Sequence, residues 1–212
     1  MSILDVAAAD IAQLSDDLLT ALLGRLVEAE ATEHGIPLNA VIHGGHGNAP
    51  DRGIDARVSW SGRPKRTDFF PRRTTVFQCK AETMSAARLK NEMAPEGKPR
   101  PLFPNLAEKH GAYVIFCGKD NCNDGMLRDR VTAMRSALSS MSGSGRLVLD
   151  FYDSSRIARW VNKHFRRGCM AARYAWPTAA RMATVPVMVA SRRKRATAIP
   201  RRQHAACCLS VR

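Results

Sequence analysis

The spacing of hydrophobic residues predicts alternating helices and strands over the first 165 residues. Leucine and valine residues recur at helical spacing after Ser15, and they predict a helix that ends near His34, before Gly35. Ser15 is typical of a helix N-cap, because Asp16 and Asp17 follow it in the first turn. The chain is therefore expected to begin its regular structure with this helix.

Shorter apolar runs predict the strands, and further helical spacing predicts the remaining helices. Residues 61–73 and 95–104 are polar or rich in proline and are predicted to be loops. The resulting order of elements predicts an α/β fold with a mixed central sheet flanked by helices. The predicted strands are 38–42, 54–60, 74–80, 112–117 and 147–151, and the later helices are 85–93, 106–110, 126–141 and 154–164.

The character of the sequence changes at about residue 165. The net charge is +14, but all 19 acidic residues lie at or before Asp153, whereas 14 of the 33 Lys and Arg residues follow it. The front part is therefore neutral, and the excess positive charge lies at the end of the chain. We predict a folded domain over 1–165 and an irregular basic tail of low order over 166–212. A shifted reading frame near residue 165 is an alternative origin of the tail.

The sequence carries no sign of a membrane or secretory protein. No apolar run approaches the roughly 18–20 residues that span a bilayer. The first ten residues contain no Lys or Arg, so the start of a secretory signal is missing. The six cysteines show no C-x-x-C spacing, which predicts reduced thiols without a metal. We therefore predict a cytoplasmic protein with no membrane partner.

One constellation of polar residues lies on two neighbouring predicted strands. Asp55 is on the face opposite its apolar neighbours, and the two-residue period of a strand places Gln78 and Lys80 on one face, on either side of Cys79. If the strands form a hairpin, the three side chains converge. The oxygens of Asp55 and Gln78, with the Cys79 carbonyl, suit Mg²⁺, and Lys80 could assist a water or neutralise charge on a phosphate. An exposed ion pair between Asp55 and Lys80, worth less than about 1 kcal/mol, is the alternative.

The two segments that carry this constellation resemble a known group of nucleases. Asp51-Arg52-Gly53-Ile54-Asp55 and Phe77-Gln78-Cys79-Lys80-Ala81 are similar to the Asp…Gln-x-Lys signature of Mrr-type restriction endonucleases, a branch of the PD-(D/E)XK superfamily. The resemblance covers about residues 15–164 and extends to nuclease modules at the N-terminus of bacterial antiphage NTPases. It implies a restriction-endonuclease-like three-layer sandwich with a mixed central sheet between helices.

The resemblance also implies an activity and a set of site residues. It implies a metal-dependent endodeoxyribonuclease that cleaves double-stranded DNA in phage defence, with Mg²⁺, or Mn²⁺ in its place, as cofactor. Asp55 and Gln78 are then the metal ligands, Lys80 is the catalytic lysine, and Glu30 from the first helix completes the catalytic set. A second copy of the chain or a sensor NTPase is the further partner implied. The alternative is a catalytically inactive module, truncated or altered at its C-terminus, that binds DNA or docks on a partner.

A basic segment between two predicted strands is the candidate DNA contact. Its cations alternate with Trp60, Phe69 and Phe70, a composition that can hold a DNA backbone and stack on bases; a solvated connection is the alternative. The candidate DNA-binding residues are Arg52, Arg63, Lys65, Arg66, Arg72 and Arg73.

Overall fold

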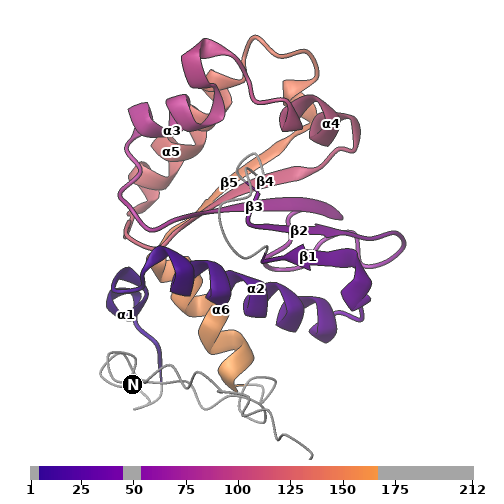
Figure 1. Ribbon diagram of the computed structural model, residues 1–212, viewed down its shortest axis with the longest axis vertical. Helices are drawn as coiled ribbons and strands as arrows, with labels where there is room; N and C mark the ends of the chain where they lie inside the picture. Colours follow the sequence, from indigo (N-terminus) through magenta and orange to yellow (C-terminus); the bar gives the residue numbers. More distant parts are fainter. Residues whose placement is uncertain (1–4, 45–53, 167–212) are drawn as a thin grey trace, which may run out of the picture.

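A computed structural model describes residues 5–44 and 54–166, and its strands form one five-stranded mixed sheet (Figure 1). The strands are β1 (Val41–His43), β2 (Ala56–Ser59), β3 (Thr74–Lys80), β4 (Ala112–Cys117) and β5 (Val148–Tyr152). They lie side by side in sequence order. β1, β2 and β3 pair antiparallel, whereas β3, β4 and β5 pair parallel. The predicted α/β class with a mixed sheet is confirmed.

Six α-helices lie in the described residues. They are α1 (Ala8–Ala12), α2 (Asp16–Glu33), α3 (Ala86–Met93), α4 (Leu102–Glu108), α5 (Asp124–Ala137) and α6 (Ser154–Arg166). The hydroxyl oxygen of Ser15 caps α2, and the helix stops where Gly35 adopts a φ of +65°, as the sequence predicts. None of the helices in these two described ranges is long and apolar enough to cross a membrane.

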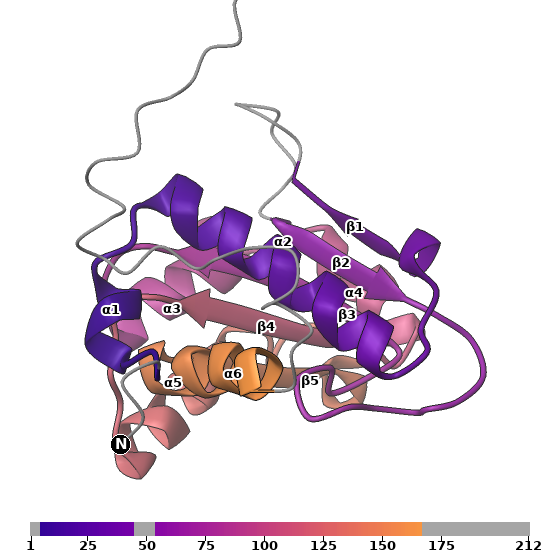
Figure 2. The same cartoon turned by 90° about the horizontal axis from the view of Figure 1, so that it is seen from below.

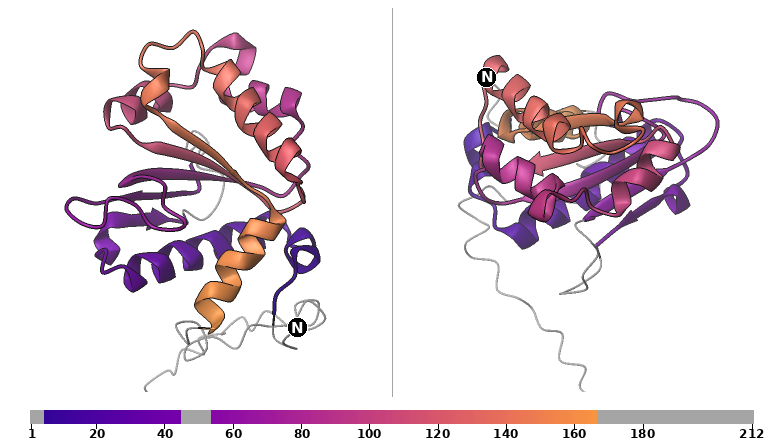
Figure 3. Two further views of the ribbon diagram at one scale, coloured as in Figure 1. Left: turned by 180° about the vertical axis from the view of Figure 1, so that it is seen from behind. Right: turned by 90° about the horizontal axis from the view of Figure 1, so that it is seen from above.

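The helices cover both faces of the sheet (Figures 1 and 2). α3, α4 and α5 pack on one face, because they form the two crossovers that join the parallel strands β3, β4 and β5. Right-handed crossovers that advance in one direction along a sheet return over the same face. α1, α2 and α6 pack on the opposite face, and the view from behind shows α6 beside α2 there (Figure 3).

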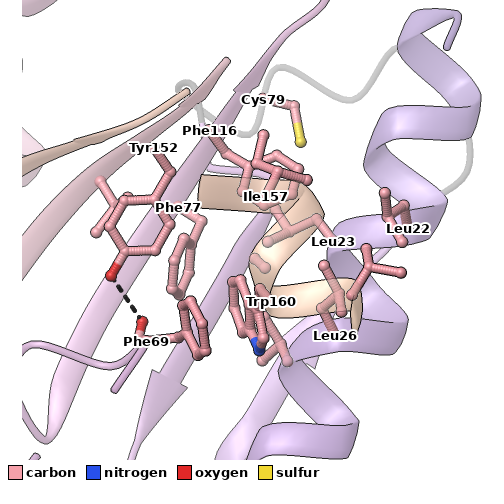
Figure 4. Packing of buried hydrophobic residues seen from close by; sticks show 14 of the residues in the cluster. Leu22, Leu23, Leu26, Phe69, Phe77, Cys79, Phe116, Tyr152, Ile157 and Trp160 are labelled. Carbon is pink, nitrogen blue, oxygen red and sulfur yellow. Dashed lines mark hydrogen bonds between the residues drawn. The ribbon is translucent and has the colours of Figure 1, made fainter. Parts of the chain in front are cut away.

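Trp160 of α6 is the centre of the core between the sheet and the helices α2 and α6 (Figure 4). Its ring is fully buried and stacks on Phe69, with centroids 4.6 Å apart and planes 5° apart. Phe77 of β3 and Tyr152 of β5 contact the same ring. The Tyr152 hydroxyl donates a 3.1 Å hydrogen bond to the Phe69 carbonyl, so this core also fixes the loop before β3.

Several details differ from the sequence prediction, and the helix predicted over 126–141 ends at Ala137. α1 was not predicted, because five residues give too short a periodic pattern. The predicted strand over 38–42 is a 3₁₀ turn, Leu38–Ala40, followed by the short strand β1. The predicted loop over 95–104 contains another 3₁₀ turn, Pro95–Gly97, and the start of α4, since proline is tolerated in the first turn of a helix.

Candidate functional site

A pocket lies where β3 ends and β2 begins. Asp55, Gln78 and Lys80 all line it, so the structure brings together the three residues that the sequence places on neighbouring strands. The strands pair antiparallel with Ala56 opposite Phe77, which sets Asp55 beside the last residues of β3. The complete lining is Asp16, Asp55, Gln78, Cys79, Lys80, Ala81 and Glu82.

The Asp55 carboxylate is fixed by the backbone of β3. The Asp55 amide donates a 2.9 Å hydrogen bond to the Phe77 carbonyl, and the Cys79 amide donates a 2.7 Å hydrogen bond to Asp55 Oδ2. Where β2 begins, Asp55 Oδ2 thus takes the place of a backbone carbonyl as the acceptor of a β3 amide. A carboxylate that accepts from a backbone amide is held in one orientation at low entropic cost.

Gln78 and Lys80 are joined by a residue of α3 that the sequence analysis did not select. Gln78 Nε2 donates to Glu92 Oε1 at 2.9 Å, and Lys80 Nζ donates to Glu92 Oε2 at 2.7 Å. Arg100 also pairs with this carboxylate, and the Tyr113 hydroxyl donates to Gln78 Oε1. The amide of Gln78 is thereby oriented from both ends, and Glu92 holds the two β3 side chains together.

The protonation states in this network are set by burial and by its hydrogen bonds. Burial alone would raise the pKa of Glu92, but hydrogen bonds from Lys80 and Gln78 hold that pKa below its usual value. Burial raises the pKa of Tyr113 far above its usual value, so its hydroxyl stays protonated and donates to Gln78. Burial, followed by the charge of Asp55, raises the pKa of Cys79 well above its usual value. The Cys79 thiol is therefore no nucleophile at neutral pH.

The donor atoms at the pocket fit a small hard cation. Asp16 and Asp55 bring carboxylates to its lining, Gln78 brings an amide whose oxygen also accepts from the Tyr113 hydroxyl, and Cys79 lines the pocket beside them. Mg²⁺ prefers oxygen donors, uses few protein ligands and keeps several waters. The pocket thus offers a Mg²⁺-compatible set of oxygens next to one ammonium group, that of Lys80.

Glu30 does not belong to this pocket, contrary to the sequence expectation. Asp16, in the first turn of α2, is the residue of that helix that lines the pocket, and Glu30 follows fourteen residues later, about 21 Å along the helix axis. The Glu30 carboxylate is fully buried and contacts α6, with Oε2 3.1 Å from Lys163 Nζ and 3.0 Å from His164 Nε2. Glu30 therefore connects α2 to α6 and does not complete the predicted catalytic set.

The buried carboxylate of Glu30 predicts a pH-dependent stability. Burial would raise its pKa, but hydrogen bonds from His164, Thr67 and Lys163 lower that pKa from 4.5 to about 2. A lowered folded-state pKa stabilises the fold above the unfolded value, and this contribution is lost as the pH falls toward the folded value. We expect Glu30→Gln to be less stable than the parent at pH 7, by up to roughly 3 kcal/mol.

The difference in melting temperature should narrow as the pH falls from 4.5 to about 2, because the parent carboxylate is then protonated. Thermal unfolding followed by circular dichroism at several pH values measures it. Glu108→Gln, on the exposed surface of α4, is the matched control and should follow the parent throughout. A difference in melting temperature between Glu30→Gln and the parent that stays constant down to pH 2.5 would contradict this role of Glu30.

The predicted DNA-contacting loop lies at the other end of the strands. It leaves β2 after Ser59 and enters β3 at Thr74, whereas the pocket is at the far end of β3, about 20 Å away along the strand. Its side chains are exposed at Arg63, Lys65, Arg66 and Arg72 and half-buried at Arg73. None of these five cations lines the pocket. Arg52 lies outside the described residues.

The aromatic residues of this loop do not serve the role that the sequence suggested. Phe69 and Phe70 are buried in the core around Trp160, and the indole nitrogen of Trp60 donates to the Pro64 carbonyl at 2.8 Å. The prediction that Phe69 and Phe70 stack on bases is wrong. Their burial supplies the apolar anchor that folds a polar loop back onto the sheet.

Two acidic residues of the site were missed because helices supply them. The sequence identifies Asp16 only as an acidic residue in the first turn of a helix, and no spacing relates it to β3. Glu92 had a partial signal: the crossover helix after β3 must cover one of the two faces of this strand, and one of them carries Gln78 and Lys80. An acid on that helix is therefore a candidate partner of Lys80.

Comparisons of the chain with protein-family models, with curated proteins and with solved structures give no match. The resemblance to Mrr-type nucleases therefore rests on the sequence alone, and the support for a function comes from the site itself.

Proposed function

We propose that residues 1–165 are a restriction-endonuclease-like domain, a three-layer sandwich whose pocket hydrolyses phosphodiester bonds of double-stranded DNA with Mg²⁺ or Mn²⁺. The observation that carries the proposal is the convergence of Asp55, Gln78 and Lys80 in one pocket at the end of β3. A phosphodiesterase needs a carboxylate for a cation and a positive group for the phosphate, and these three residues supply both. A role in phage defence belongs to the same proposal.

Each residue has a defined part in the proposed reaction. Asp55 would hold the ion, with oxygen donors from Gln78 and the Cys79 carbonyl; the bound ion would neutralise charge on the phosphate. The Lys80 ammonium would donate hydrogen bonds to the attacking water or to a phosphate oxygen. The water oxygen bonds to phosphorus and loses a proton to solvent, the bond from phosphorus to one sugar oxygen breaks, and that oxygen takes a proton from solvent, so a phosphomonoester and a sugar hydroxyl result. Glu92 acts as a positioning residue, because it fixes Lys80 and Gln78.

A catalytically inactive DNA-binding or docking module is the second candidate, and one observation favours it. Glu92 binds both the Lys80 ammonium and the Gln78 amide, so the two groups already have partners inside the protein. In an active enzyme this ion pair must loosen, or share its hydrogen bonds with substrate, when DNA is bound. A nuclease and an inactive DNA-binding module therefore differ in cleavage and not in affinity for DNA, whereas a docking module need not bind DNA.

Plasmid cleavage tests the proposal through Lys80. Lys80→Met keeps most of the apolar stem and removes the charge, and we expect it to lower the Mg²⁺-dependent cleavage rate by about a hundredfold or more. Lys90→Met, on the exposed surface of α3, is the matched control and should cleave at the parental rate. Supercoiled DNA is incubated with each protein and the nicked product is quantified on a gel. A parent protein that binds DNA and cleaves it with neither Mg²⁺ nor Mn²⁺ would support the inactive module.

A further inference from the structure

A second cluster of ionisable side chains lies between the C-terminal half of α2 and the end of α6. Its members are Glu30 and Glu33 of α2 and His164 of α6, with Lys163 of α6 beside them; we call it the α2–α6 cluster. It lies on the face of the sheet opposite the face that α3 covers, and it shares no residue with the pocket at Asp55. The cluster is nearly closed to solvent, because the side chains of Glu30 and His164 are 0% exposed and that of Glu33 is 13% exposed.

The donor atoms of this cluster have the spacing of a metal site. One nitrogen of His164 and one carboxylate oxygen each from Glu30 and Glu33 lie within 4.8 Å of one another. His164 Nδ1 is 3.4 Å from Glu33 Oε2. Ligands about 2.0–2.1 Å from a tetrahedral zinc ion are about 3.3 Å apart, so little movement is needed to place both atoms on one ion.

The imidazole of His164 is the observation that points to a ligand. Its Nδ1 is buried and has no hydrogen-bond partner, an unfavourable state for a polar atom away from water. Its Nε2 lies 3.0 Å from Glu30 Oε2. The indole nitrogen of Trp160 also donates a 3.1 Å hydrogen bond to Nε2, so Nδ1 is the ring nitrogen without a partner and the one that faces Glu33.

The charges of the cluster also favour a cation. The carboxylates of buried Glu30 and partly exposed Glu33 share the ammonium group of Lys163, which lies 3.1 Å from Glu30 Oε2 and 3.4 Å from Glu33 Oε2, and Glu30 Oε1 also lies 3.2 Å from His34 Nε2. The same ammonium is 3.2 Å from the exposed carboxylate of Asp68. The Lys163 side chain can therefore swing toward Asp68 and water without losing every partner, and this movement would vacate the cation position.

We propose that the α2–α6 cluster binds a divalent transition metal ion of the zinc type through Glu30, Glu33 and His164, and that the Lys163 ammonium takes the place of this ion when no metal is bound. One nitrogen and two carboxylate ligands favour Zn²⁺ over Mg²⁺, which selects oxygen donors. Water would fill the fourth position. The bound ion would clamp α6 to α2 in place of the ion pairs of Lys163 with Glu30 and Glu33, and in addition to the core around Trp160.

Metal titration of the full-length, tag-free protein tests this proposal. Zn²⁺ is expected to bind with one-to-one stoichiometry in calorimetry and to raise the melting temperature as its concentration increases, because it binds the folded state. Co²⁺ in the same site should give ligand-field absorption without a sulfur-to-metal charge-transfer band, which distinguishes the cluster from cysteine sites. The indole nitrogen of Trp160 is 3.1 Å from His164 Nε2, so Co²⁺ should also quench its fluorescence.

Replacing a proposed ligand should weaken Zn²⁺ binding, and replacing the competing lysine should strengthen it. Glu33→Gln, the mildest change because Glu33 is partly exposed, and His164→Gln should each weaken Zn²⁺ binding about tenfold or more. Lys163→Met removes the competing ammonium and should strengthen binding severalfold, whereas Lys109→Met, on the exposed surface after α4, should leave it unchanged. Circular dichroism confirms that each variant folds.

The proposal is overturned if the parent shows no saturable binding of Zn²⁺, or if Glu33→Gln binds as tightly as the parent while Lys163→Met brings no gain. It does not depend on the proposed nuclease function. Asp55→Asn should bind Zn²⁺ in the α2–α6 cluster as the parent does, so failure of one proposal leaves the other intact.

Discussion

Replacing Asp55 by Asn is expected to lower the Mg²⁺-dependent cleavage rate by about a hundred- to a thousandfold while leaving the fold unchanged. The substitution removes the charge that would hold the ion. Asn keeps a side-chain oxygen, which can still accept the hydrogen bond from the Cys79 amide that Asp55 Oδ2 accepts at 2.7 Å. Asp55→Ala is the poorer test, because it would also leave that amide without its partner.

Plasmid nicking measured over a range of Mg²⁺ concentrations checks this prediction. A weakened ion site should need more Mg²⁺ for the same cleavage rate. The cleavage rate of Asp55→Asn should therefore recover partly at high Mg²⁺ concentration. Asp124→Asn, at an 80% exposed position in the first turn of α5, is the matched control and should behave as the parent. If Asp55→Asn nicks DNA at the parental rate and with the parental Mg²⁺ dependence, Asp55 is not the metal ligand.

Replacing Trp160 by Ala is expected to destabilise the fold by about 3–5 kcal/mol. The side chain is fully buried among Phe69, Phe77, Phe116 and Tyr152, and its loss leaves a large cavity in a core that connects α6 to the sheet. A loss of this size is a large part of the 5–15 kcal/mol by which a domain is stable.

Urea unfolding followed by circular dichroism measures the loss. Trp60→Ala is the matched control: Trp60 is only half-buried at the edge of the same cluster, 5.9 Å from Phe70, and its loss should cost clearly less. Equal losses at the two positions would show that Trp160 is not the centre of this core.

Residues with strong local signals were predicted well. β3 and β4 occupy the predicted ranges, 74–80 and 112–117, because the first is rich in strand-forming residues and the second is a near-continuous apolar run. The ends of α2 follow from the Ser15 cap and from Gly35. The placement of Gln78 and Lys80 on one face needed only the two-residue period of a strand, and antiparallel pairing then brought Asp55 beside them.

The remaining features depend on contacts between elements that are distant in the sequence. Glu30 and Asp16 are both acids of α2, and only the packing of that helix decides that Asp16 reaches the pocket while Glu30 meets α6. Phe69 and Phe70 stand in a basic segment, and local composition gave no sign that Trp160, about ninety residues later, buries them. Periodicity indicates which face a residue takes, but it does not indicate which element covers that face.

The most direct test of the central claim is the position of a bound divalent ion. Crystals of the full-length protein soaked in Mn²⁺ and measured for anomalous scattering would locate it without an activity assay. The account predicts a peak about 2.2 Å from a carboxylate oxygen of Asp55, beside the Gln78 amide and the Cys79 carbonyl, and no such peak in Asp55→Asn crystals. A fully soaked crystal with no peak at Asp55 would contradict it.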